Sequence, residues 1–253
     1  MGVARDAVLV AAERGSNNQS FVVTAPGGRW VLRISENLSL DEVRAEHRLL
    51  ARLRGAGLPF EVPQPVTALD GRTVIATAAG PATLCRWIPG VRPDLADERA
   101  IEGFGRTLGL LSQALRPVPP ADAPHDWRIN PLRAHPDAPG IDELCRSLTD
   151  SGVREEQAAL LQSGVLYGPR WQRHVGALVH GYVSVSRLSR AELCAVPELF
   201  LCRAVGSVLW RAARWRRGQV QLSEVATRLT RLEAIMYWLT TSREEFLTLM
   251  ATG

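Results

Sequence analysis

The chain has 253 residues, a formal net charge of +4, 46% hydrophobic residues and 22% charged residues. This composition is typical of a folded globular protein and excludes an intrinsically disordered chain. A charge this small for the length does not by itself indicate nucleic-acid binding.

The first part of the chain reads as a strand-rich region with one helix. Five short β-branched or apolar runs bounded by turn residues predict strands at 20–24, 29–34, 63–66, 72–77 and 83–88. Residues 25–28 (Ala-Pro-Gly-Gly) join the first two as a hairpin. Ser39 is placed to cap a helix over 39–53, which Gly55 and Gly57 end.

A Pro-Gly-Val-Arg-Pro run at 89–93 ends the strand pattern, so we place a boundary there, between 1–92 and 93–253. The second part is expected to be mostly helical. Apolar residues at helical spacing predict helices at 98–115, 141–148, 154–162, 172–182, 189–217 and 222–249. Pro197 is expected to kink the fifth of these or to lie in its first turn.

Three stretches in the first part resemble the aminoglycoside phosphotransferase and homoserine kinase-like family. They are Gly15 to Val23, Gly28 to Ile34 and Ala45 to Leu50, and weaker likeness resumes at 125–128, 181–185 and 208–218. The resemblance implies an α+β, bilobal protein-kinase-like fold, with a strand-rich N-lobe at 1–92 and a helical C-lobe at 93–253. It also implies ATP-dependent phosphorylation of a hydroxyl group on a small molecule.

The resemblance carries six residues over to a nucleotide site. They are Ser16, Asn17 and Asn18 in the loop over the phosphates, Arg33 as the basic strand residue, Glu46 as its helical partner, and Trp87 at the hinge beside the adenine. The family usually has Lys where this chain has Arg33, and the chain contains no Lys at all. The Arg33–Glu46 pair can serve a ligand, or it can only lock helix to sheet.

The family's catalytic loop has no counterpart in this chain. Such a loop reads H-x-D-x-x-x-x-N and is followed by an Asp that holds magnesium, but the chain runs from 168 to 179 without either. His174 and His180 are each followed two positions later by a residue that is not Asp, so we read them as packing or surface histidines. We therefore name no catalytic and no metal-binding residue, and expect weak ATP binding, no held Mg2+ and an inactive or impaired kinase.

Two alternatives stay open. An active small-molecule kinase would need relocated carboxylates from Asp126, Asp137 or Asp142, although Asn130 lies one position too close to Asp126 for the catalytic spacing. A nucleic-acid-binding protein would use basic and aromatic residues of one helix: Arg203, Trp210, Arg211, Arg214, Trp215, Arg216 and Arg217. Our prediction remains a small-molecule or nucleotide ligand and no nucleic acid.

Other features bear on partners and location. None of the four cysteines forms a C-x-x-C pair that would indicate zinc. Residues 1–14 lack the basic-then-apolar order of a secretion signal, and no apolar run reaches the roughly 18 residues that span a bilayer. We expect a cytoplasmic protein without a membrane partner, and a protein partner or second copy that covers a shortened C-lobe.

Overall fold

The computed structural model describes residues 7–12, 18–91, 93–94, 96–119, 137, 139–140, 143–144, 146–147 and 170–252. These residues fall into two compact units. The first unit holds the described residues up to 91 together with 111–119, and the second unit holds 93–110 and the described residues from 137 onward.

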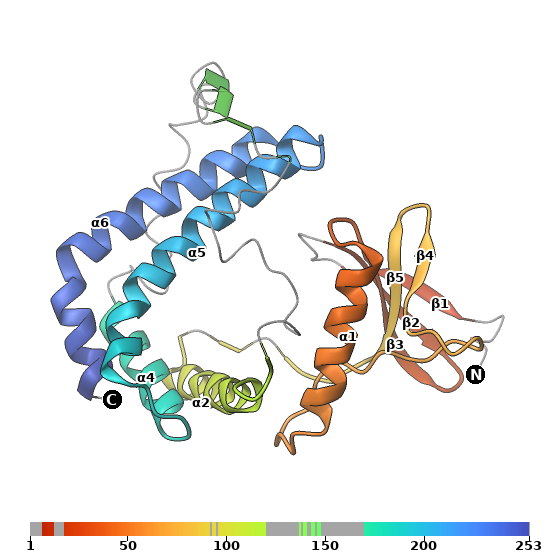
Figure 1. Ribbon diagram of the computed structural model, residues 1–253, viewed down its shortest axis with the longest axis horizontal. Coiled ribbons are helices and arrows are strands. Elements are labelled where there is room, and N and C mark those ends of the chain that lie inside the picture. The colour runs from red at the N-terminus through yellow and green to blue at the C-terminus, as the bar shows by residue number, and fades with distance from the viewer. Residues whose placement is uncertain are drawn as a thin grey trace. The chain divides into compact units, whose positions relative to one another are not determined.

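A five-stranded antiparallel sheet forms most of the first unit (Figure 1). Its spatial order is β1-β2-β3-β5-β4. The strands are β1 (Val8–Ala11), β2 (Asn18–Ala25), β3 (Gly28–Ser35), β4 (Ile75–Thr77) and β5 (Gly80–Arg86). The β2–β3 turn depends on Gly28, whose φ of 136° is a backbone conformation that side chains with a Cβ rarely adopt.

The register of the sheet sets which side chains lie on the same face. Arg33 of β3 lies opposite Ser20 of β2 and opposite Thr83 of β5. Residues directly opposite each other in an antiparallel sheet share a face. Ser20, Arg33 and Thr83 therefore form a polar row across three adjacent strands.

Helix α1 (Leu40–Arg54) follows β3 and packs against β5. It begins at a capping box, in which the Ser39 hydroxyl accepts from the Glu42 amide and the Glu42 carboxylate accepts from the Ser39 amide. It ends at Gly55, and the chain then turns at Gly57, where φ is +67°. This confirms the predicted helix and its cap.

Helices make up the second unit. Its elements are α2 (Glu98–Leu115), which belongs to this unit up to Leu110, α4 (Trp171–Val183), α5 (Arg190–Arg216) and α6 (Leu222–Thr252). The long helices α5 and α6 run side by side (Figure 1), and α4 packs on α6. Trp238 of α6 is central to the core, with its ring edge-to-face against Trp171 of α4 at 5.0 Å and against Phe246 at 5.3 Å.

Glycines bring α2 and α4 into close backbone contact. A Cβ at Gly105 of α2 would lie 2.0 Å from the carbonyl oxygen of Leu178, and a Cβ at Gly181 of α4 would lie 1.9 Å from that of Glu102. The Nδ1 atom of His180 lies 3.1 Å from the Glu102 carboxylate at the same crossing. His180 is thus a surface histidine that contacts a carboxylate of another helix. The residues next to His180 in the sequence do not predict this contact.

The expected fold class, strand-rich with one helix followed by helices, is confirmed. Two strands differ from prediction: β1 was not expected, and residues 63–66 contribute only the isolated bridge between Pro65 and Cys85. Pro197 lies inside α5 and not in its first turn. The helix predicted at 154–162 and most of the one at 141–148 lie outside the described residues.

Helix α5 is long and apolar enough to cross a bilayer by length and composition alone. This differs from the expectation that no apolar run reaches that length. One such helix among the described residues is weak evidence, because a core helix of a soluble protein passes the same test. Here α5 packs along α6 and contributes Val208 and Ala212 to the core.

Candidate functional site

The candidate site of the first unit is built around an ion pair between sheet and helix. The Nη2 atom of Arg33 on β3 donates to Oε2 of Glu46 on α1 at 2.5 Å. The two side chains keep 32% and 27% of their exposure, so the pair is sheltered yet open to a ligand. The structure therefore brings together the two residues on which the sequence prediction depended most.

A buried histidine adjoins this pair. His47 follows Glu46 on α1, and its ring is only 8% exposed. Its Nδ1 lies 2.8 Å from the Thr73 hydroxyl, and its Nε2 lies 3.3 Å from the hydroxyl of Thr83. Burial, and then the positive charge of Arg33, lower the pKa of His47, while Glu46 opposes this change. The site therefore favours a neutral imidazole that ties α1 to the sheet.

Cys85 lies two residues beyond Thr83 on β5, on the same face of the sheet. Burial raises the pKa of the Cys85 thiol and Glu46 adds to the rise, although Arg33 opposes it. The protonated thiol is a weak nucleophile and a poor metal ligand. Cys85 therefore acts as packing beside the ion pair.

Trp87 lies directly after β5, where its amide donates to the carbonyl oxygen of Arg29 at 3.1 Å. The Arg29 guanidinium lies over the Trp87 ring, 4.4 Å from its centroid. One face of the proposed adenine-side residue is thus occupied by a cation from β3.

The residues expected in the phosphate loop are only partly in view. Asn18 is the first residue of β2 and pairs with Ser35, so it belongs to the sheet edge of that loop. Ser16 and Asn17 lie outside the described residues. The structure therefore places four of the six predicted residues and brings Arg33 and Glu46 into contact.

Of the three carboxylates considered for an active kinase, the structure describes Asp137. Asp137 accepts a hydrogen bond from Arg217 at 2.8 Å, and Asp126 and Asp142 lie outside the described residues. Residues 171–179, where the catalytic loop was sought, belong to α4. In the described ranges, no three His, Cys, Asp or Glu side chains are placed to hold a metal ion.

The arginine and tryptophan cluster of α5 is divided between the interior and the surface: Arg203, Arg216 and Arg217 are exposed. Trp210, Arg211 and Arg214 are each at most 6% exposed, and Arg211 donates to Glu224 of α6 at 2.9 Å. Arg217 is held by Asp137. Trp210, Arg211 and Arg214 are therefore packing residues and do not form a surface for base stacking or phosphate contact.

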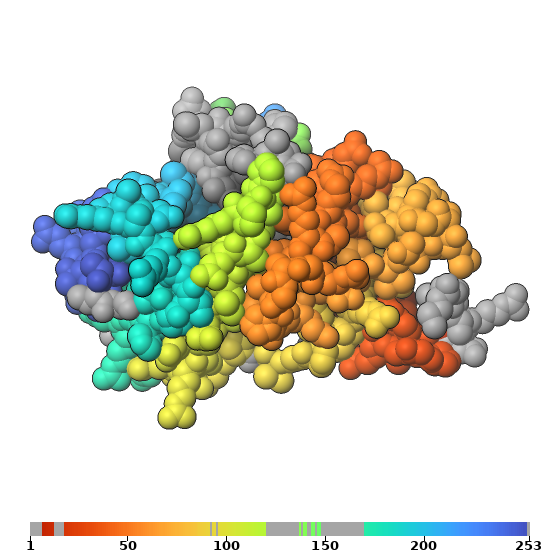
Figure 2. All heavy atoms as spheres, turned by 60° about the horizontal axis from the view of Figure 1, so that its bottom comes forward, coloured from red at the N-terminus to blue at the C-terminus, as the bar shows by residue number. Residues whose placement is uncertain are grey.

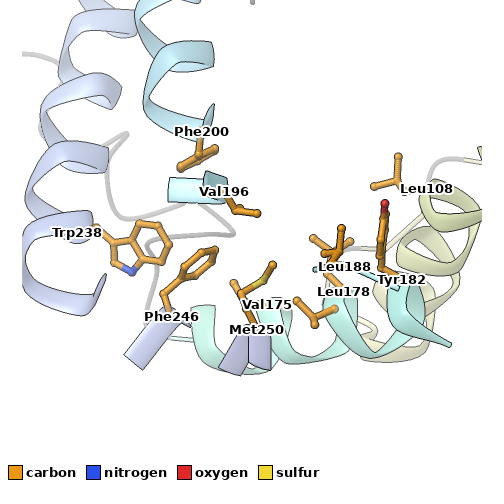
Figure 3. A pocket seen from close by; sticks show the side chains of 11 residues that line it. Leu108, Val175, Leu178, Tyr182, Leu188, Val196, Phe200, Trp238, Phe246 and Met250 are labelled. Carbon is orange, nitrogen blue, oxygen red and sulfur yellow. The ribbon is translucent and has the colours of Figure 1, made fainter. Parts of the chain in front are cut away.

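The second unit contains an apolar hollow of about 320 Å³. Figure 3 shows Trp238, Phe246 and Phe200 at one end of it and Leu178, Leu188 and Tyr182 at the other. Its walls come from α2, α4, α5, α6 and the segment before α5. A hollow of this size and lining can enclose the apolar part of a small molecule.

Sequence reasoning missed His47, Thr83 and Cys85. A signal for His47 was present, because it lies four residues after buried Val43 and so falls on the apolar face of α1. Thr83 and Cys85 lie two residues apart on β5. Their position beside Arg33 depends on the β3–β5 register, which cannot be read from the sequence.

The chain is similar to a known family of enzymes. Residues 8–181 match the APH phosphotransferase enzyme family. No curated protein sequence is significantly similar to the chain.

Three solved structures share the fold. A microcompartment-associated aminopropanol kinase is 16% identical with a TM-score of 0.63, and the alignment covers 96% of this chain and 94% of that one. An amicoumacin kinase, solved with AMP-PNP, Ca2+ and Ami, is 13% identical with a TM-score of 0.60, covering 92% and 89%. An aminoglycoside phosphotransferase from Alicyclobacillus acidocaldarius is 14% identical with a TM-score of 0.52, covering 96% and 94%. These likenesses confirm the kinase-like fold.

Proposed function

The chain belongs to the APH phosphotransferase enzyme family, and from this premise we propose that its first unit binds the phosphates of ATP through Arg33. The observation that carries the proposal is the 2.5 Å contact between Arg33 and Glu46. Glu46 engages one nitrogen of the guanidinium and fixes the direction of the side chain. The remaining N–H groups are then available to phosphate oxygens.

The Arg in place of the usual Lys suits this role. A guanidinium is planar, stays charged and can bind two phosphate oxygens at once, whereas an ammonium is a point charge. The partial exposure of Arg33 allows a ligand to reach it. A protein of similar fold also supports nucleotide binding, since the amicoumacin kinase was solved with AMP-PNP.

We further propose that phosphoryl transfer is impaired. Transfer needs a carboxylate beside the acceptor hydroxyl and ligands for a divalent ion that offsets the phosphate charge. The sequence contains no complete H-x-D-x-x-x-x-N run, and α4 occupies the described part of the interval 168–179. Without those groups Arg33 alone offsets the triphosphate charge, so binding is expected to be weak. The chain would then act as an ATP-binding pseudokinase that also takes a small-molecule ligand.

The test measures the melting temperature with ATP, with and without Mg2+, and then ATP hydrolysis and transfer to small alcohols. ATP should raise the melting temperature of the natural chain, and Arg33→Ala should abolish the rise. Arg72→Ala is the matched control, because Arg72 forms an exposed ion pair with Asp70 in the same unit. A rise that survives in Arg33→Ala contradicts the binding proposal.

Activity decides between the impaired and the active form. If the chain binds ATP but hydrolyses it no faster than buffer alone does, the result supports impaired phosphoryl transfer. Turnover that disappears in Asp126→Ala, Asp137→Ala or Asp142→Ala would instead establish an active kinase with relocated carboxylates.

A further inference from the structure

A groove runs along the side of α1, distinct from the Arg33–Glu46 pair. It is a hollow of about 460 Å³ between α1 and the segment that leads to β4. Its polar lining comes from Arg44, Arg48 and Arg54 of α1 and from Gln64, Thr67 and Thr73 of the segment. We call it the α1 groove. Figure 2 shows α1, in orange, at the surface of the first unit.

All the charge that lines the α1 groove is positive. Its ionisable side chains are three arginines and His47, and no carboxylate lines it. Within the described ranges, Arg48 and Arg54 have no ion-pair or hydrogen-bond partner. Arg44 contacts only Asp41, at 2.9 Å, and the Asp41 side chain is 89% exposed. Such an exposed pair contributes little and leaves Arg44 free to turn toward a ligand.

The His47 ring in the lining is held in place. Both ring nitrogens of His47 are engaged, by Thr73 and Thr83. The binding charge therefore comes from the arginines, while Gln64 and Thr67 of the lining add neutral hydrogen-bonding groups.

We propose that the α1 groove binds a small polyanion. Guanidinium groups bind phosphate and carboxylate oxygens through paired hydrogen bonds. Three of them around one hollow match a ligand with at least two anionic groups. The volume lies in the range of small-molecule pockets. Arg33 and Glu46 do not line the groove, so the site is separate from the proposed phosphate site.

The experiment titrates the 253-residue chain with pyrophosphate and, separately, with citrate, at constant ionic strength in an isothermal calorimeter. The Arg48→Ala, Arg54→Ala double variant should weaken binding at least tenfold. Arg52→Ala is the matched control, because Arg52 is exposed on the same helix and does not line the groove; it should bind within twofold of the natural chain. Tighter binding of pyrophosphate would identify a phosphorylated ligand, and tighter binding of citrate a polycarboxylate; either result supports the site.

Three results would overturn the proposal. One is the absence of binding for both anions at millimolar concentration. Another is an equal loss in Arg52→Ala, which would mean that only the general positive charge of α1 matters. The third is a loss in Arg33→Ala with none in the double variant, which would place the anion at the proposed phosphate site. All variants are checked for an unchanged far-ultraviolet spectrum, and Arg48→Gln replaces Arg48→Ala if the double variant does not fold.

Discussion

His47 is a buried titratable residue of the first unit, so its contribution to the free energy of unfolding depends on pH. Burial and Arg33 hold its pKa below the ordinary value of 6.5. The folded state therefore resists protonation more than the unfolded state does. The stabilisation is fully present above pH 6.5 and is lost as the pH falls below it.

We therefore expect the free energy of unfolding of the natural chain to decrease between pH 7 and pH 5. One such group contributes a slope of at most about 1.4 kcal/mol per pH unit. His47→Gln keeps a hydrogen-bonding side chain and removes the titration, so its slope should be smaller, although its stability at pH 7 should be lower. Urea unfolding at several pH values measures both slopes. Equal slopes in the two proteins would show that His47 does not titrate in this range.

Among single residues, the family resemblance of the sequence was enough to pair Arg33 with Glu46, and the structure has this contact. It was not enough to find His47, although the residue is next to Glu46. A polar residue on an apolar helix face breaks the hydrophobic pattern, and its role cannot be assigned until its hydrogen-bond partners are known. Those partners, Thr73 and Thr83, come from segments 26 and 36 residues away.

Among the elements, the α2–α4 crossing depends on glycines where backbones touch. A Cβ at Gly181 would overlap the Glu102 carbonyl oxygen at 1.9 Å, and a backbone cannot yield as a flexible side chain does. Gly181→Ala should therefore lower the free energy of unfolding by about 1–3 kcal/mol.

Gly176→Ala on the same helix is the matched control. Nothing lies within 4 Å of a Cβ built there, so the change should be neutral or stabilising by up to about 1 kcal/mol from helix propensity. Chemical denaturation followed by circular dichroism compares the two. If both variants are equally stable, the helices do not cross as closely as described.

The elements also show where sequence patterns work and where they do not. Helix α2 has the predicted bounds of 98 and 115, because its apolar residues recur at helical spacing. The strand β1 was missed although Val-Leu-Val-Ala is a short β-branched and apolar run, and all four of its residues are exposed. Its existence depends on pairing with β2, a contact that composition does not reveal. The α2–α4 contact could not be predicted either, since glycines in a helix do not indicate which helix packs against them.

For the whole molecule, the two compact units allow independent unfolding. Each has its own apolar residues: Val23, Val43 and Val74 are buried in the first, and the Trp238 cluster is buried in the second. Two-state behaviour is common for a single domain and fails when domains are not tightly coupled. We therefore expect two thermal transitions.

Variants placed in one unit at a time test this expectation. Gly181→Ala should lower only the transition of the second unit, and ATP should raise only that of the first, through Arg33. Differential scanning calorimetry resolves the transitions and measures how far each of them shifts. A single transition that shifts with both Gly181→Ala and ATP would mean that the units unfold together. In that case nucleotide bound to the sheet would stabilise the helices as well, and the two units would have to be treated as one cooperative domain.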